Sequence, residues 1–172
     1  KSVSPNDNSK PSFKAVDLEG NSNILHFAIE KRIKKFVYVS AFHAEKYPQL
    51  EYFRVHQLFS ERLMASGIDY SIIKPPALFS AFIDVMDMAR KGRLVNIGKG
   101  NKKTNPIYEG DLAKIIVQAM HQPKAIIEAG GKNIYTRKQL NEIIHAAVGH
   151  TSKLRTVPVW LFHIGLPVIR LI

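Results

Sequence analysis

The sequence contains no cysteine, and this absence limits both its compartment and its chemistry. Without thiols the chain has no disulfide scaffold and no thiolate metal site. A cysteine-free chain fits a reducing compartment, so we predict a cytoplasmic location. No stretch approaches the roughly 20 apolar residues of a transmembrane segment. The first residues, beginning at Lys1, also lack the apolar segment of a signal peptide.

Acidic residues are few, since 14 Asp and Glu stand against 25 Lys and Arg, a formal net charge of +11. Such a charge attracts nucleotides, nucleic acids or acidic membrane surfaces. The basic residues are scattered in pairs, for example Lys31-Arg32 and Arg90-Lys91. No aromatic residues alternate with them, as they do in proteins that stack single-stranded bases. We therefore expect mostly solvated lysines and no nucleic acid partner, with the phosphates of a dinucleotide as the alternative.

A glycine-rich phosphate loop is also missing, because neither Gly-x-x-Gly-x-x-Gly nor Gly-x-Gly-x-x-Gly occurs in the sequence. Gly98 and Gly100 resemble such a loop only weakly. A phosphate loop joins a strand directly to a helix N-terminus, whereas here the extended segment 104–108 intervenes. We predict a plain hairpin-like turn at these two glycines.

Two short β-branched and aromatic runs, Phe36–Ser40 and Tyr70–Ile73, flank a segment with helical periodicity, Glu51–Ser66. This spacing is typical of a β-α-β unit. The carboxyl ends of both strands then meet at one crevice, where open α/β sheets bind ligands. Ser40 and the segment Lys74-Pro75-Pro76 are expected on that rim. Tyr52 and His56, four residues apart, share one helix face.

The patterns on either side predict alternating helices and strands. We expect Asp17 or Asn21 to cap the first helix and Thr136 to open another with a capping box. The other predicted elements are helices Asp17–Lys34, Phe79–Arg90, Leu112–Met120 and Thr136–Val148, and strands Leu94–Ile97, Asn133–Tyr135 and Lys153–Val157.

Several of these segments together resemble one family. They resemble the atypical short-chain dehydrogenase/reductases, in the NAD(P)-binding, NmrA-like branch. The resemblance rests on "FVYVSA", on Tyr52 followed four residues later by the basic residue His56, and on "GIDYSIIKPPALF". "VDLEGNSNIL", "NIGKGNKKTNPIYEGDLAKII" and "GGKNIYTRKQLNEII" extend the resemblance over nearly the whole chain. The stretch before Ser12 would follow the family's fourth strand. About half of the nucleotide-binding sheet is therefore expected outside these 172 residues.

The order of elements and this resemblance predict an α/β fold with a doubly wound parallel sheet, the C-terminal portion of a Rossmann-like domain, and a small α/β C-terminal lobe. Residues 1–97 would form the partial NAD(P)-binding domain, with 1–12 flexible. Residues 98–172 would form the smaller substrate lobe, interleaved with the first domain.

The resemblance also implies site residues. Tyr52 would transfer the proton and Ser40 would polarise the substrate carbonyl, while His56 replaces the family's lysine, which binds ribose and lowers the phenol pKa. A histidine is mostly neutral at pH 7 and supplies less of that field. The cofactor would be NADP or NAD, and its expected contacts are Ser40, Ala41, Phe42, Tyr52, His56, Pro75, Pro76, Ala77, Leu78 and Phe79.

Two functions stay open. One is an NAD(P)-dependent oxidoreductase acting on a small carbonyl or alcohol; the other is a non-catalytic NAD(P)-binding sensor or assembly protein. No metal constellation or Gly-x-Ser-x-Gly elbow supports another chemistry. The apolar tail 160–172 predicts a core helix or, alternatively, a contact with another subunit or a membrane surface.

Overall fold

The predicted β-α-β unit is present, and a third strand extends its sheet. The structure is a computed structural model that describes residues 12–160. Strand β1 (Lys35–Val39) pairs in parallel with β2 (Asp69–Lys74) in a register running from Lys35↔Asp69 to Val39↔Ile73. Helix α2 (Glu51–Ala65) connects them. Strand β5 (Ala125–Glu128) joins the other side of β2, also in parallel. The α/β prediction with a parallel sheet is confirmed.

Strand β5 is an element that the sequence analysis does not predict. It has only four residues, of which two are isoleucines, and it begins five positions after a helix. A short apolar run of this kind has no periodicity that separates strand from helix. In the described residues β5 and β1 are the two edges of the sheet, whose order is β1-β2-β5.

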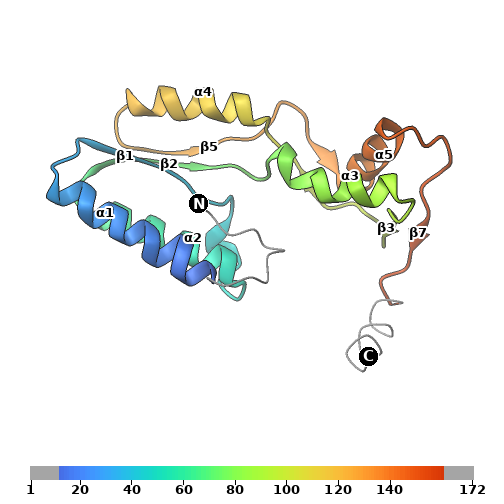
Figure 1. Cartoon of the computed structure of the whole chain (residues 1–172), viewed down its shortest axis with the longest axis horizontal. Coiled ribbons are helices and arrows are strands. Elements are labelled where there is room, and N and C mark those ends of the chain that lie inside the picture. The colour runs from blue at the N-terminus through green and yellow to red at the C-terminus, as the bar shows by residue number, and fades with distance from the viewer. Residues whose placement is uncertain (1–11, 161–172) are drawn as a thin grey trace. The chain divides into compact units, whose positions relative to one another are not determined.

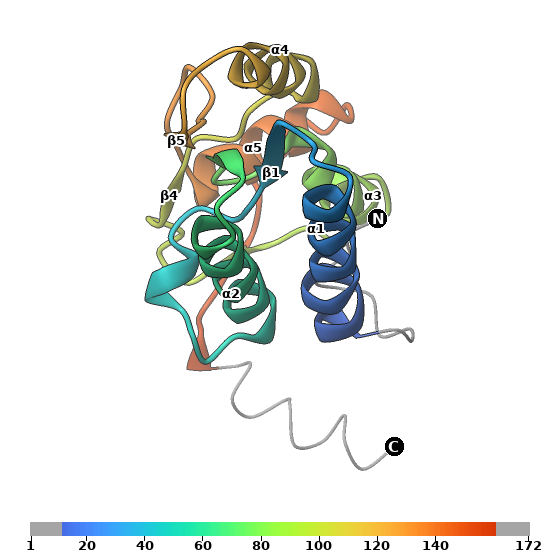
Figure 2. The same ribbon diagram turned by 90° about the vertical axis from the view of Figure 1, so that its left-hand side faces the viewer.

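Helices cover both faces of this sheet (Figure 1). The π-helix η1 (Lys14–Gly20), α1 (Asn21–Glu30) and α2 lie on one face, and α4 (Glu109–Met120) lies on the other. Figures 1 and 2 both show α1 and α2 side by side. The core between α2 and the strands is apolar, and burying each large side chain contributes about 1.5–3 kcal/mol. Its members are Leu18, Leu25, Tyr38, Val55, Phe59, Leu63, Tyr70 and Ile72.

The first predicted helix begins earlier than expected, and its predicted caps are wrong. The residue before η1 is Phe13, so Asp17 lies inside η1, where it is 2% exposed. Asn21 is also helical, and its Nδ2 donates to the backbone oxygen of Asp17 at 2.8 Å. A short polar side chain within a helix often donates to a carbonyl of the preceding turn in this way, whereas at an N-cap it would accept from a backbone N–H.

The remaining elements are short strands and helices around a second core. They are the 3₁₀ helix η3 (Phe79–Phe82), α3 (Ile83–Arg90), β3 (Asn96–Ile97), β4 (Lys103–Thr104), β6 (Tyr135–Thr136), α5 (Arg137–Ala147) and β7 (Thr156–Val157). A further 3₁₀ helix, η2 (Ala44–Lys46), lies between β1 and α2. The second core consists of Phe82, Ala89, Leu94, Leu140 and Ile144. The predicted capping box is confirmed, because Thr136 Oγ1 accepts from Gln139 N and Gln139 Oε1 accepts from Thr136 N.

The hairpin-like turn at Gly98 and Gly100 is a wrong prediction. β3, before the turn, pairs in parallel with β7, whereas β4, after it, pairs antiparallel with β6. Both glycines have φ near +59°. At Gly100 a side chain would also approach the Lys138 backbone nitrogen to 3.2 Å. The turn therefore packs against the start of α5, a long-range contact that local sequence does not reveal.

The chain folds into two compact units. The first contains the described residues up to Pro76 together with Ile107–Gly130, and the second contains Ala77–Pro106 together with the described residues from Gly131. The division into domains after Ile97 stays a prediction. No helix in residues 12–160 is both long and apolar enough to cross a membrane. The predicted flexible start and almost all of the apolar tail lie outside the described residues.

Candidate functional site

The carboxyl ends of β1 and β2 run on side by side, as expected for neighbouring parallel strands. Ser40 N donates to Ile73 O at 2.8 Å, and Phe42 N donates to Pro75 O at 3.2 Å. Ser40 and Ala41 are buried, whereas Phe42 and Pro75 are half-buried. The structure thus brings the predicted residues after β1 next to those after β2.

Helix α2 supplies Tyr52 and His56, which contact each other on one face. Their ring centroids are 4.6 Å apart in a T-shaped arrangement with an interplanar angle of 73°. Tyr52 also packs edge-on against Phe13 and Phe53. The tyrosine is half-buried, while His56 is only 4% exposed. The pair therefore lies in an aromatic environment with little contact with solvent.

Tyr38 is a site residue that the sequence analysis does not identify. Its hydroxyl lies 2.5 Å from His56 Nδ1, and its side chain is buried. The signal for it was the alternation along β1. Residues two apart in a strand point to the same face, so Tyr38 and Ser40 share one. Tyr38 is thus the residue of β1 that holds the histidine.

Ser60 is the second residue that sequence reasoning missed. Its Oγ donates to the backbone oxygen of His56 at 2.8 Å and lies 3.1 Å from Ser40 Oγ. A hydroxyl has one hydrogen, and a carbonyl only accepts. The Ser60 hydrogen is therefore used on His56, and Ser40 is the donor in the serine pair. The Ser40 hydroxyl points its hydrogen into the protein at Ser60.

Burial and a nearby carboxylate set the protonation of these groups. Burial raises the pKa of Tyr52, and the charge of Asp17 raises it further. The pKa of Tyr38 is raised for the same two reasons and, in smaller part, by Tyr52. Burial lowers the pKa of His56, with Asp17 acting in the opposite direction. At neutral pH both phenols are protonated and the histidine is neutral, so His56 does not supply the positive charge of a lysine.

Comparison with known proteins identifies the family of the chain. A family model described as NAD(P)H-binding matches residues 4–123, well over half of the chain. The chain belongs to this NAD(P)H-binding family. The chain shares its Rossmann-type fold with solved structures of reductases and epimerases. The Bordetella bronchiseptica enzyme WbmH, solved with NAD+, superposes with a TM-score of 0.74 at 12% identity, over 92% of this chain and 60% of that one.

Curated relatives and another solved structure extend the comparison. A chloroplastic divinyl chlorophyllide a 8-vinyl-reductase from Cucumis sativus is 28% identical over 93% of this chain and 40% of its own length. A photosystem II assembly factor from Cyanophora paradoxa is 34% identical over 40% of this chain and 21% of its own. An NADPH-dependent quinone oxidoreductase from Escherichia coli, solved with NADPH, has a TM-score of 0.67 at 20% identity, over 87% of this chain and 52% of that one. This chain spans less than half the length of these curated relatives.

The predicted cofactor contacts of this NAD(P)H-binding chain fall in both units. Ser40, Tyr52, His56 and their neighbours belong to the first unit, whereas Ala77, Leu78 and Phe79 belong to the second. Leu78 precedes η3, and Phe79 is 44% exposed. The observed contacts among these residues lie in the first unit, and the catalytic and cofactor-binding roles of all the predicted residues stay predictions.

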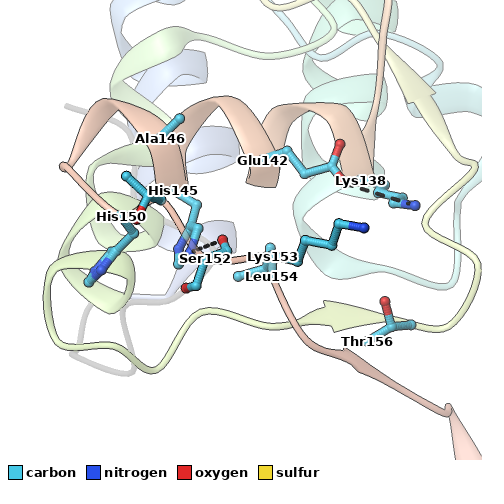
Figure 3. A pocket seen from close by; sticks show the side chains of 10 residues that line it. Lys138, Glu142, His145, Ala146, His150, Ser152, Lys153, Leu154 and Thr156 are labelled. Atoms are coloured by element: carbon cyan, nitrogen blue, oxygen red, sulfur yellow. Dashed lines mark hydrogen bonds and ion pairs between the residues drawn. The ribbon is translucent and has the colours of Figure 1, made fainter.

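The second unit has a pocket of about 400 Å³, which lies along α5 from Lys138 to Ala146 (Figure 3). The rings of His145 and His150 stack there at 4.6 Å. His145 Nε2 donates to Ser152 O at 3.1 Å, which is drawn in Figure 3. None of the predicted site residues lines this pocket. Among residues 12–160 no group of three or more metal-ligating side chains is present.

Proposed function

We propose that the protein is an NAD(P)-dependent reductase of the atypical, NmrA-like short-chain type, acting on a small carbonyl substrate. The observation that carries this proposal is the Tyr52–His56 contact on α2, with the phenol of Tyr52 held in its protonated form. A reduction needs a proton donor, whereas alcohol oxidation needs a base. A tyrosine that is protonated at neutral pH can supply the proton of the reduction, although its raised pKa makes it a weaker acid than a free phenol.

The cofactor supplies the hydride for such a reduction. Tyr52 donates its proton to the oxygen of the carbonyl as the carbon is reduced to an alcohol, and Ser40 donates a hydrogen bond to that oxygen. An orphaned atom in the first unit fits a cofactor contact, because His56 Nε2 is buried without a hydrogen-bond partner among the described residues. Either NADP or NAD satisfies these groups.

A second candidate function is a non-catalytic NAD(P)-binding sensor or assembly protein. It is favoured by the neutral state of His56, since no cation there stabilises a Tyr52 phenolate. The relatives allow both functions: one is named a reductase and another an assembly factor. The names describe those proteins, and for this chain the substrate, the activity and any oligomeric partner are proposals.

The test is turnover by the intact protein with NADPH or NADH and a panel of small carbonyl compounds, followed at the absorbance band of the reduced nicotinamide. Tyr52→Phe should abolish turnover because it removes the proton donor. Tyr108→Phe, which alters an exposed tyrosine, is the matched control and should keep it. Turnover that survives in Tyr52→Phe would overturn the assignment. Cofactor binding without turnover across the panel supports the second function.

The cytoplasmic location also stays a proposal, based on the absence of cysteine. The curated reductase relative from Cucumis sativus is named chloroplastic. Expression of the full-length protein with a fluorescent C-terminal fusion distinguishes the two: plastid fluorescence would contradict the cytoplasmic assignment.

A further inference from the structure

The His56 side chain has one nitrogen with a partner and one without. Nδ1 lies 2.5 Å from the Tyr38 hydroxyl, whereas Nε2 has no hydrogen-bond partner in residues 12–160. The residue is 96% buried, being 4% exposed. A buried polar atom without a partner destabilises a protein unless a ligand or water satisfies it. Nε2 is therefore the atom of this site that lacks an interaction.

The Tyr38 bond decides which nitrogen of His56 carries hydrogen. Burial keeps the Tyr38 phenol protonated and the histidine neutral. The phenol hydrogen points at Nδ1, which lies 2.5 Å from the hydroxyl oxygen. In a neutral imidazole one nitrogen accepts and the other donates. Nδ1 accepts from Tyr38, and Nε2 is a donor.

The surroundings hold Tyr38 rigidly in this role. Its ring packs edge-on against Phe59 with centroids 4.6 Å apart, and Phe59 is fully buried. The backbone of Tyr38 is paired with Ile72 in the sheet. The phenol therefore has little freedom to turn away from the histidine.

We propose that Tyr38 is a positioning residue that fixes the tautomer and orientation of His56, so that His56 offers Nε2–H as a hydrogen-bond donor to an oxygen of the bound dinucleotide. This inference rests on the cofactor-binding role proposed above for His56. A lysine supplies both charge and donors, whereas a neutral histidine held by Tyr38 supplies only a donor. Nε2 is covered in this structure, so binding includes a rearrangement of the side chains around it.

The first test is the tautomer in the free protein, read from the ¹⁵N shifts of the His56 ring and its two-bond proton correlations. The intact wild-type protein should show the Nε2–H form. Tyr38→Phe should shift the ring toward a mixture of the two tautomers. Tyr70→Phe is the matched control, because Tyr70 is a buried tyrosine on the adjacent strand β2. An Nδ1–H ring in the wild type, or a ring unchanged by Tyr38→Phe, would overturn the inference.

The second test is NADPH affinity, measured by calorimetric titration of the same proteins. Tyr38→Phe should weaken binding roughly three- to tenfold, the effect of about one hydrogen bond, and Tyr70→Phe should not. In a His56→Gln background the amide donates without help from Tyr38, so the added Tyr38→Phe should have little further effect. Equal weakening in both backgrounds, or no binding of NADPH by the wild type, would contradict the proposed role. A protein that binds NADPH in this Tyr38-dependent way but reduces nothing would refute the reductase proposal and leave this inference standing.

Discussion

The hydrogen-bond chain from Ser40 through Ser60 to His56 makes the two serines unequal, and this inequality is measurable. In Ser40→Ala, the Ser60 hydroxyl keeps its bond to the His56 carbonyl. In Ser60→Ala, the Ser40 hydroxyl loses its acceptor while it is only 4% exposed. We expect Ser60→Ala to lower the free energy of unfolding by about 1–3 kcal/mol, the cost of a stranded buried donor. Ser40→Ala should cost about 0.5–1.5 kcal/mol, the value of one hydrogen bond.

The assay is urea denaturation of the wild type, both single variants and the double variant. Because the double variant removes both partners, the two effects should not add, and a coupling of about 0.5–3 kcal/mol is expected. Ser152→Ala, at an exposed serine, is the control and should stay within about 0.5 kcal/mol of the wild type. Equal costs for the two single variants, or additivity within about 0.5 kcal/mol, would refute the assigned donor directions.

The hydrogen bonds from Ser40 through Ser60 to His56 also affect the proposed reaction. To polarise a carbonyl, Ser40 must turn its hydrogen away from Ser60 and toward the substrate. Ser60→Ala removes that competition and should therefore lower KM in the intact protein, even though it destabilises the fold. A raised KM would show that Ser60 orients Ser40 productively.

Two further substitutions test the Tyr52–His56 pair and the core that packs against Tyr38. In His56→Lys, an ammonium beside Tyr52 should preserve or raise turnover if the protein is a reductase, because it stabilises the phenolate. Under the sensor hypothesis only the cofactor affinity should change. A complete loss of turnover in a folded His56→Lys variant would contradict the reductase proposal. Phe59→Ala should cost about 3–5 kcal/mol in urea denaturation, because Phe59 is fully buried between Phe36 and Tyr38; a loss below about 1 kcal/mol would show that this core is loosely packed.

The sequence predicted the β-α-β unit because its helix, Glu51–Ala65, is long and strongly periodic. Strand β5 was not predicted, because four residues are too few to show a periodicity that separates a strand from a loop or a buried helical turn. The turn at Gly100 was misread for another reason. Its conformation depends on close packing against Lys138, and this contact is made by residues distant in sequence.

The candidate site was predictable only where it depends on local spacing. Tyr52 and His56 contact each other because four residues separate them on a helix. Tyr38 and Ser60 join them through tertiary packing. The alternation along β1 places Tyr38 on the same face as Ser40, but local sequence does not show whether such a buried residue bonds to a histidine or only packs in the core. Asp17 was interpreted as a cap, a common role for aspartate near a helix start, whereas the structure buries it where its charge acts on both phenols.

The neutral, buried state of His56 also predicts how the stability of the protein depends on pH. Burial lowers the pKa of His56 in the folded protein, so below about pH 6.5, the ordinary value, the unfolded chain takes up a proton that the folded chain does not. Stability therefore falls as the pH drops from about 6.5 through the folded-state pKa. Urea denaturation at pH 7.5 and 5.5 should show a smaller loss at the lower pH in His56→Gln than in the wild type. His121→Gln, at an exposed histidine, should retain the wild-type loss. If His56→Gln lost as much stability as the wild type, His56 would take up its proton as easily in the folded protein as in the unfolded chain, and burial would not lower its pKa.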